Sequence, residues 1–394
     1  MGWKEGGKAE ARWALVERVR QGQSVAEASR ESGVSRVTAH KWLKRARERG
    51  REGMEERGKR PRKLRWVKAR GEWEDRLIKA HRKYPSWGSK KLTVYLKRGR
   101  RGKGVPSLST IGRMLRELGL SRSRRWRKRG PKLPMRERRA AIRSNDVWAV
   151  DFKGCFHTLD GEKCDTLTIT DLASRYVLCC QVMEATTLEA VREQMDKVFR
   201  HYGLPKVLRS DNGQPFGSPG PHRLSKLNVW WLKLGIEVEH TRPGHPADNG
   251  SHERMHRTLK ADTQQPAASD VREQQRRYDR WRKYFNDERP HEALAMRVPA
   301  SIYRSSRRRT MEPKPVRYPV NWEVRVVKGK GEISWQCQRR FIGEAFAGES
   351  VALKPINEKE VHVYFGKLLI GALSRTGTRG LRPSVFVPSS QLEC

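Results

Sequence analysis

Several features that define other protein classes are missing from this sequence. Its six cysteines form no C-x-x-C pair and no cysteine and histidine cluster with zinc spacing, which argues against a disulfide framework and a zinc finger. No apolar run approaches the roughly 18 residues that span a bilayer, and the first residues lack the apolar segment of a signal peptide. We therefore expect a soluble, intracellular protein with reduced thiols.

Acidic residues are scarce relative to basic ones. The chain has 85 Lys and Arg against 44 Asp and Glu, a formal charge of +41 and a pI of about 10.7. This excess indicates a polyanionic partner, and nucleic acid is favoured over a membrane because no basic amphipathic helix or lipidation motif is present. The length of 394 residues predicts two to four domains.

The first 50 residues carry the pattern of three helices. The third helix is basic, and Ser35 is its candidate N-cap. We expect Val37 and Trp42 to pack inward while polar residues face out. Residues 1–50 are therefore predicted to form a helix-turn-helix domain, with a small helical bundle that has a solvated basic face as the alternative. The candidates for the groove-facing side are Arg36, Thr38, His40 and Lys41.

A second helical unit and a basic linker follow. Residues 72–120 predict another helix-turn-helix-like domain, with Ser109 as the N-cap of its last helix and Gly119 at its end. Residues 121–143 carry eleven Lys and Arg against one acid, Glu137, and two prolines interrupt them. Such a segment cannot form a packed core and is predicted to be a linker that follows DNA phosphates. Its candidate contacts are Arg125, Lys128 and Arg129.

The composition then changes to β-branched and alternating runs. Three successive strands, followed by alternating helices and strands, predict an α/β domain over residues 144–305. This element order is that of a ribonuclease H-like mixed sheet flanked by helices. Short strands separated by glycines predict a small β-barrel over residues 315–394. DNA binding and subunit assembly are equally open as the role of the barrel.

Three acidic residues stand in different local settings. Asp151 ends an apolar strand in Trp-Ala-Val-Asp-Phe-Lys, Asp211 meets a turn in Ser-Asp-Asn-Gly, and Glu253 opens a helix in Asn-Gly-Ser-His-Glu-Arg. Carboxylates from three elements can converge on two hard cations about 3.5 to 4 Å apart, which activate a nucleophile and neutralise charge in phosphodiester chemistry. We expect two Mg²⁺ ions there, with Mn²⁺ as a substitute.

Taken together, these motifs resemble those of DDE transposases of the IS481 group, which are related to IS3-type transposases and have a retroviral integrase-type core. The resemblance covers nearly the whole chain and is carried by residues 148–153, 210–213 and 243–260. It implies that Asp151, Asp211 and Glu253 are the catalytic metal ligands. It also implies cleavage at the ends of a mobile element and transfer of the exposed 3′-hydroxyl to target DNA.

The resemblance implies partners as well as chemistry. The expected partners are double-stranded DNA, as element terminal inverted repeats and as target, and further copies of the chain, because two ends must be paired. No membrane partner is expected, and the predicted location is the cytoplasm, in association with the nucleoid.

The helix that carries Glu253 also carries basic residues on the same face. Counting from a start near Asn249, that face holds His256, Arg257 and Lys260. By the resemblance, its basic residues hold the DNA end beside the metals, and a solvated basic face is the alternative. His252 is expected to be structural or to face phosphate rather than to bind metal.

The spacing of the second and third acids departs from the integrase pattern. The 41 residues between Asp211 and Glu253 exceed the usual spacing, and we attribute the surplus to a Gly- and Pro-rich surface loop at 216–222.

Other acids and other functions are less consistent with the sequence. Asp146, Asp165, Asp171 and Asp248 have turn or surface explanations and are not expected to bind metal. A non-catalytic, sequence-specific DNA-binding repressor or architectural protein is the first alternative function, but it would not need an intact acidic set. A ribonuclease H-like nuclease or resolvase without strand transfer is the second, which the two recognition units disfavour.

Overall fold

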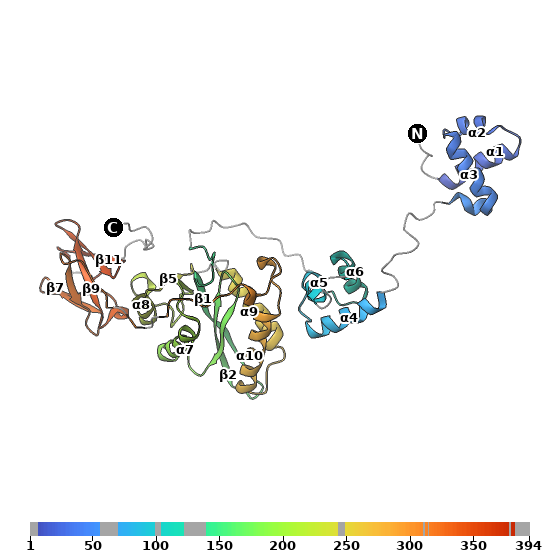
Figure 1. The fold of residues 1–394 in the computed structure, drawn as a ribbon. Coiled ribbons are helices and arrows are strands. Elements are labelled where there is room, and N and C mark those ends of the chain that lie inside the picture. The colour runs from blue at the N-terminus through green and yellow to red at the C-terminus, as the bar shows by residue number, and fades with distance from the viewer. Residues whose placement is uncertain are drawn as a thin grey trace. The chain divides into compact units, whose positions relative to one another are not determined.

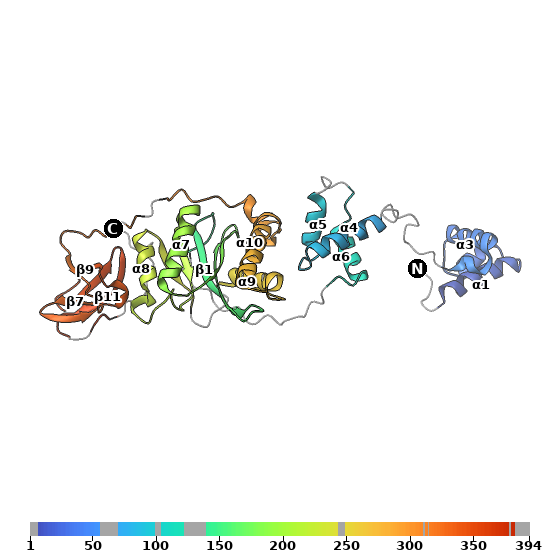
Figure 2. The ribbon, with the colours of Figure 1, turned by 90° about the horizontal axis from the view of Figure 1, so that it is seen from below.

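The computed structural model describes eight stretches of the chain, shown in two orientations in Figure 1 and Figure 2. They are residues 7–55, 70–98, 104–121, 139–242, 249–309, 312–313, 315–377 and 380–382. The chain divides into two compact units, Met1–Gly71 and Glu72–Cys394. The predicted linker contacts Arg125, Lys128 and Arg129 lie outside the described residues. In the stretches that the structure covers, no helix is long and apolar enough to cross a membrane.

The first unit is a bundle of three helices closed by a short 3-10 turn. The Ser35 side chain accepts a hydrogen bond from the Thr38 backbone N–H and so caps the third helix as predicted. The bundle packs around Val16, Trp42 and Met54. Its elements are α1 (Lys8–Arg20), α2 (Val25–Glu31), α3 (Arg36–Arg49) and η1 (Gly50–Met54).

Val37 does not pack inward, so that prediction is wrong. Its side chain is 81% exposed, whereas Trp42 is 5% exposed. The two residues are five positions apart on α3, which places them about 140° apart around the helix. The inner side of α3 is filled instead by the Arg12 guanidinium, 4.0 Å above the Trp42 ring, which also donates a hydrogen bond to the Met54 carbonyl. The apolar Val37 therefore stands on the outer, basic side of α3.

The second unit begins with three more helices. The N-cap of the third is Ser107, whose hydroxyl accepts from the Thr110 backbone N–H, and not Ser109 as predicted. The helix starts earlier than predicted, because Ser107 already has the extended backbone of a cap. These helices are α4 (Arg70–Lys83), α5 (Ser89–Arg98) and α6 (Leu108–Glu117).

The loop between α4 and α5 packs against the end of helix α10 (Val271–Asp287). Tyr84 and Trp87 stack with centroids 4.0 Å apart, and the Tyr284 ring extends the stack at 5.5 Å from Tyr84. The Tyr84 hydroxyl donates to Glu288, and Lys83 pairs with the same carboxylate at 3.2 Å. Aromatic stacking and charge thus attach the helical unit to the α/β domain.

A five-stranded sheet forms the centre of the α/β domain. The strand order is β3-β2-β1-β4-β5, with antiparallel pairing among β1, β2 and β3 and parallel pairing of β1 with β4 and of β4 with β5. The predicted mixed sheet is therefore confirmed. The strands are β1 (Val147–His157), β2 (Lys163–Asp171), β3 (Val177–Met183), β4 (Val207–Ser210) and β5 (Glu237–His240).

Helices cover both faces of this sheet (Figure 1). On one face, α7 (Leu188–Tyr202) and α8 (Lys226–Lys233) pack on Trp148, Val150 and neighbouring side chains. On the other, α9 (Gly250–Thr263) and α10 pack on an apolar cluster that includes Cys180. Because side chains alternate along a strand, Asp151 falls on the face that α9 covers.

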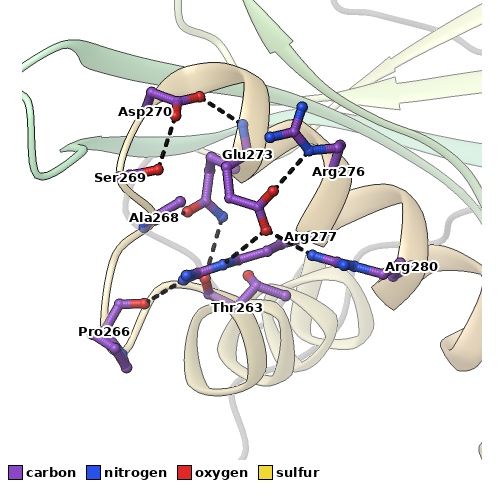
Figure 3. Close-up of polar contacts among 10 residues, drawn as sticks. Thr263, Pro266, Ala268, Ser269, Asp270, Glu273, Arg276, Arg277 and Arg280 are labelled. Atoms are coloured by element: carbon purple, nitrogen blue, oxygen red, sulfur yellow. Dashed lines mark hydrogen bonds and ion pairs between the residues drawn. The ribbon is translucent and has the colours of Figure 1, made fainter.

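The turn between α9 and α10 is held by polar contacts (Figure 3). Asp270 caps α10 by accepting from the Glu273 backbone N–H at 2.8 Å. The Glu273 carboxylate contacts Arg276 and Arg280, each at 2.7 Å, and Arg277 at 3.7 Å. The hydrogen bond from Arg276 holds the pKa of Glu273 below its usual value. These contacts fix the start of α10, and Gln274 joins it to the end of α9 by donating to the Thr263 carbonyl at 3.2 Å.

The C-terminal strands form two separate ladders. A four-stranded sheet has the order β11-β10-β9-β6, and β7 pairs only with β8. Neither ladder closes on itself in the part of the chain that the structure describes, so the predicted barrel is not found. The elements are β6 (Glu323–Val326), β7 (Glu332–Trp335), β8 (Gln338–Phe341), η7 (Glu344–Phe346), β9 (Ser350–Pro355), β10 (Glu360–Phe365) and β11 (Leu368–Ser374).

The C-terminal β region and the α/β domain share one apolar core. A single buried cluster runs from Trp148 through Trp231 on α8 to Phe346 and Leu373. Lys233 on α8 also pairs with Glu349 at 2.7 Å. The β region is thus packed on the helix that covers the sheet, rather than joined to the domain by the chain alone.

The loop that follows Asp211 takes part in this packing. Phe216 is buried in the shared core. Pro221 lies close to Gly343, because a Cβ added to Gly343 would be 3.0 Å from the Pro221 ring. The His222 side chain hydrogen-bonds with the backbone of Leu369 and Ile370. The residues predicted to be a surface loop are therefore an interface with the β region.

Candidate active site

Asp151 lies in β1 at the edge of the face that α9 covers. Burial raises the pKa of its carboxyl to about 7, and the negative charges of Asp211 and Glu253 add to the increase. These charges act on Asp151 because the three carboxylates lie near one another, although their elements are far apart in sequence. The structure therefore brings the three predicted residues together.

Asp211 directly follows β4, where the parallel pairing of β4 with β5 ends. Asn212 donates its side-chain N–H to the Thr241 carbonyl at 2.6 Å, and His240 Nδ1 lies 3.1 Å from the Asp211 carbonyl oxygen. A side chain at Gly213 would have its Cβ 3.1 Å from Asp211 Oδ2, so glycine leaves room for the carboxylate. Asn212 and Gly213 thus shape the turn that presents Asp211.

Glu253 is in the first turn of α9, which begins after the N-cap residue Asn249. Its side chain is half-buried, as are those of Asp151 and Asp211. A carboxylate in the first turn is stabilised by the positive end of the helix dipole. Glu253 thus lies partly exposed on α9, near enough for its charge to act on Asp151.

The three carboxylates fit a divalent cation. Asp211 Oδ1 is buried and has no hydrogen-bond partner among the described residues. A buried acceptor without a partner is costly, and in the same place burial, with the nearby charge of Asp211, raises the pKa of Asp151. Oxygen ligands of this kind suit Mg²⁺ and Mn²⁺, which would satisfy both groups.

A second group near Asp151 has the composition of a metal site. Possible ligand atoms of Asp151, His252 and His256 lie within 4.8 Å of one another. The His252 ring nitrogens, however, are within 2.8 Å of the Thr168 hydroxyl and 2.7 Å of the Thr170 hydroxyl, and His256 Nε2 is 2.7 Å from Thr168. Because the imidazoles already have protein partners and Mg²⁺ prefers oxygen, the carboxylates are the better ligand set.

The helix face predicted to meet DNA is only partly available. His256 is 8% exposed, and burial lowers its pKa to about 2, so it is a neutral group inside the domain. The structure contradicts its prediction as a DNA contact, because α9 turns this position toward β2. Arg257 and Lys260 are exposed, so DNA contact at these two stays a prediction. His252, 1% exposed, is structural, one of the two roles expected for it.

The first-unit residues predicted to face a DNA groove reach solvent. Arg36, His40 and Lys41 are exposed and Thr38 is half-buried. Thr38 Oγ1 lies 2.9 Å from the Ser35 hydroxyl, so it also contributes to the cap of α3. Their contact with DNA remains a prediction.

The other acids have structural partners. Asp171 is buried and accepts from the backbone N–H groups of Asn145 and Ser174, each at 2.7 Å. Asp146 accepts from the Arg143 backbone and pairs with Lys206 at 2.9 Å. Asp165 pairs with Lys163 at 2.7 Å, and Asp248 lies outside the described residues.

Sequence reasoning missed Thr168 and Thr170, which contact the histidines beside Glu253. The available signal was the alternation Asp-Thr-Leu-Thr-Ile-Thr-Asp in β2, which places every threonine on one face. Leu167 and Ile169 face the main core, so the threonines face α9 and α10.

Comparison with protein families matches most of the chain in parts. Two models, each described as an integrase core domain, match residues 141–246 and 234–299. Two homeodomain-like models match residues 7–55 and 38–115. The model for the C-terminal domain of IS481 family transposases matches residues 322–379.

Curated relatives include insertion-element and retroviral proteins. The chain is 24% identical over 194 residues to an uncharacterised 31.7 kDa protein of insertion element IS407 from Burkholderia multivorans, covering 49% of this chain and 67% of that protein. It is 26% identical over 187 residues to a 39.2 kDa protein of IS476 from Xanthomonas euvesicatoria, covering 45% and 50%. A match to the Pol polyprotein of a radiation murine leukemia virus, 30% identical over 113 residues, covers 29% and 18%. The chain thus spans half of the IS476 protein and under a fifth of the viral polyprotein.

Solved structures with similarity to the chain include viral integrases. The catalytic core domain of HTLV-2 integrase in complex with magnesium is 12% identical, with a TM-score of 0.33 and coverage of 41% of this chain and 99% of that one. A simian T-cell lymphotropic virus intasome in complex with PP2A regulatory subunit B56 gamma is 17% identical, with a TM-score of 0.36 and coverage of 75% and 99%.

The matched segments follow one another along the chain. Homeodomain-like helices, an integrase core and the IS481-specific C-terminal domain occur in turn along one chain. Two of the curated relatives are also insertion-element proteins. The chain is thus similar to IS481 family transposases in its C-terminal part and to integrase core and homeodomain-like domains in the parts before it.

Proposed function

We propose that the protein is a DDE-type DNA transposase that binds the ends of its mobile element, cleaves them and joins the exposed 3′-hydroxyl to target DNA. The observation that carries this proposal is the meeting of three carboxylates, from β1, from the turn after β4 and from α9, at one edge of the sheet. A structural or DNA-binding role gives no reason to place three acids where their charges oppose one another.

Asp151, Asp211 and Glu253 would hold two Mg²⁺ ions, with Mn²⁺ as a substitute. When bound, such ions supply charge neutralisation at the phosphate and activation of the attacking oxygen. The protein's own part is to aim the carboxylates, through the β1–β2 ladder, the Asn212 contact with Thr241 and the packing of α9. The half-buried setting keeps the surrounding dielectric low, which strengthens these interactions.

The two helical units supply DNA binding in this proposal. Helix α3 would enter a groove with Arg36, Thr38, His40 and Lys41, and Arg257 and Lys260 on α9 would hold the DNA end beside the carboxylates. The excess of basic residues over acidic ones favours contact with phosphates throughout the chain. Pairing of two element ends requires at least two copies of the chain, so we propose a homo-oligomer on DNA.

A Mg²⁺-dependent assay on labelled element-end DNA tests the proposal. The DNA would come from the flanks of the gene, and wild type would be compared with Asp211→Asn and Glu253→Gln. We expect wild type to cleave the ends and join them to target DNA, while both variants bind the ends and remain inert. If wild type only binds, the non-catalytic DNA-binding function replaces this proposal; if it cleaves without joining, the nuclease function does.

A further inference from the structure

Thr168 connects the strand of one carboxylate with the helix of another. In the β1–β2 ladder it is the direct partner of Asp151, and its hydroxyl lies 3.1 Å from the Asp151 carbonyl oxygen. The same hydroxyl lies 2.8 Å from His252 Nε2 and 2.7 Å from His256 Nε2, both on α9. One buried oxygen thus contacts three groups that belong to β1 and α9.

The hydrogen atoms in this group can be assigned from its acceptors. The Asp151 carbonyl can only accept, so the Thr168 hydroxyl donates its single hydrogen there. Both lone pairs of Thr168 are then free to accept from the Nε2–H groups of His252 and His256. His252 Nδ1 is left as an acceptor, and the Thr170 hydroxyl donates to it at 2.7 Å. This assignment satisfies every contact and requires that the His252 imidazole be neutral.

Both imidazoles are enclosed by the domain, with His252 1% exposed and His256 8% exposed. The two rings also pack edge to face, with centroids 4.5 Å apart. The group is therefore a buried, hydrogen-bonded layer next to the carboxylates.

The two histidines attach α9 to β2 on both sides of Glu253. His252 directly precedes Glu253 and His256 is three residues after it, so both ends of that helical turn are attached to the residue opposite Asp151. A shift of α9 along or away from β2 would break two short hydrogen bonds. The spacing between Asp151 and Glu253 is thereby tied to one hydroxyl.

We propose that Thr168, with His252 and His256, is a positioning network that sets the separation of the Asp151 and Glu253 carboxylates and so the metal affinity of the site. This inference rests on the metal site of the proposed function, and its consequence for strand transfer rests also on the proposed transposase activity. Partners that orient metal ligands from behind typically change metal affinity or activity by about 10- to 100-fold when they are removed.

The experiment compares Thr168→Val with Thr168→Ser and Thr166→Val in the full chain. Valine has the shape of threonine without the hydroxyl, and serine restores it. Thr166 is the matched control, since it is equally buried on the same face of β2 but its hydroxyl contacts Tyr278 at 3.2 Å. Mn²⁺ binding is measured by electron paramagnetic resonance, and strand transfer is measured separately, with melting curves to confirm folding.

We expect Thr168→Val to weaken Mn²⁺ binding by about tenfold or more, with Thr168→Ser and Thr166→Val within about threefold of wild type. His256→Phe, which keeps a ring but removes the donor, should weaken it similarly and serves if Thr168→Val does not fold. Equal Mn²⁺ affinity in Thr168→Val and Thr166→Val, or no Mn²⁺ binding by wild type, would overturn the network. A third outcome separates the two proposals. If wild type binds Mn²⁺ but performs no strand transfer, and only Thr168→Val and His256→Phe lose Mn²⁺ binding, the transposase proposal fails and the network is supported.

Discussion

The Trp87 indole N–H donates a hydrogen bond to the Tyr284 hydroxyl at 2.5 Å, although 197 residues separate them in the chain. Arg289 donates to the same hydroxyl at 2.9 Å. The Tyr284 oxygen therefore receives two donors at the place where the helical unit α4–α6 meets the end of α10.

Removal of this oxygen should loosen the attachment. We expect Tyr284→Phe to keep the ring stack but to cost about 1–3 kcal/mol of stability, because two donors lose their acceptor. Thermal unfolding and limited proteolysis of the full chain would show the change. Tyr95→Phe is the control, since its ring packs edge-on against Tyr84 and Trp87 from α5 within the helical unit. Equal stability and cleavage in the two variants would contradict the prediction.

The raised pKa of Asp151 predicts a pH dependence of the metal-free protein. With a folded value of about 7 and an ordinary value of 3.8, the folded state binds the proton more tightly, so stability should fall as the pH rises from about 4 to 7. Asp151→Asn should therefore raise the melting temperature at pH 8, with a gain that shrinks toward pH 5. Melting curves in chelator would measure this.

The same melting temperatures should be measured with a divalent cation in place of the chelator. Mg²⁺ should stabilise wild type at pH 8, where the carboxylate is charged, and should have little effect on Asp151→Asn. A melting temperature of wild type that does not respond to Mg²⁺ at pH 8 would count against the carboxylates as ligands.

Arg257 and Lys260 should contribute to DNA binding without supporting the fold. Each side chain is exposed on the face of α9 that carries Glu253. We expect Arg257→Ala and Lys260→Ala each to reduce the slope of log affinity against log salt by about 1 on element-end DNA. Arg254→Ala is the charge-matched control, because its side chain lies about 100° around the helix from Glu253. A control variant that loses as much would show a general charge effect.

Val37 should contribute to sequence preference rather than to stability. Its exposed side chain stands among the basic residues of α3, where a methyl group can contact the methyl of a thymine. Val37→Ala should change unfolding by less than about 0.5 kcal/mol but weaken binding to the element end more than binding to random DNA. Trp42→Ala should instead cost about 3–5 kcal/mol. Equal loss on both DNAs would refute a base contact by Val37.

The parts of the site that the sequence predicts are those with a local signature. Asp151 ends a hydrophobic strand, Asp211 precedes a turn glycine and Glu253 opens a helix, so each setting is encoded within a few residues. Thr168 has no such signature, because a threonine in a strand gains its role only when α9 packs over it. His256 was misplaced for the same reason, since helical periodicity defines a face but not what covers it.

The fold divides in the same way into features that local sequence predicts and features that depend on packing between distant segments. Strand and helix order in the α/β domain follows from periodicity, and the mixed sheet agrees with it. Closure of the C-terminal strands depends on which edges pair, and β7 and β8 pair with each other instead of extending the sheet. The loop after Asp211 reads as surface by its glycines and prolines, yet Phe216 lies in the shared core.

That shared core has a consequence for how the protein can be divided. Trp231 on α8 and Phe346 in the β region belong to the same buried cluster. A shortened chain that ends near residue 315 would therefore expose an apolar surface on α8. Such a fragment would be prone to self-association, and its inactivity would say nothing about whether the β region touches DNA. The border between family modules in this chain is therefore not a border between units that can be separated and still fold.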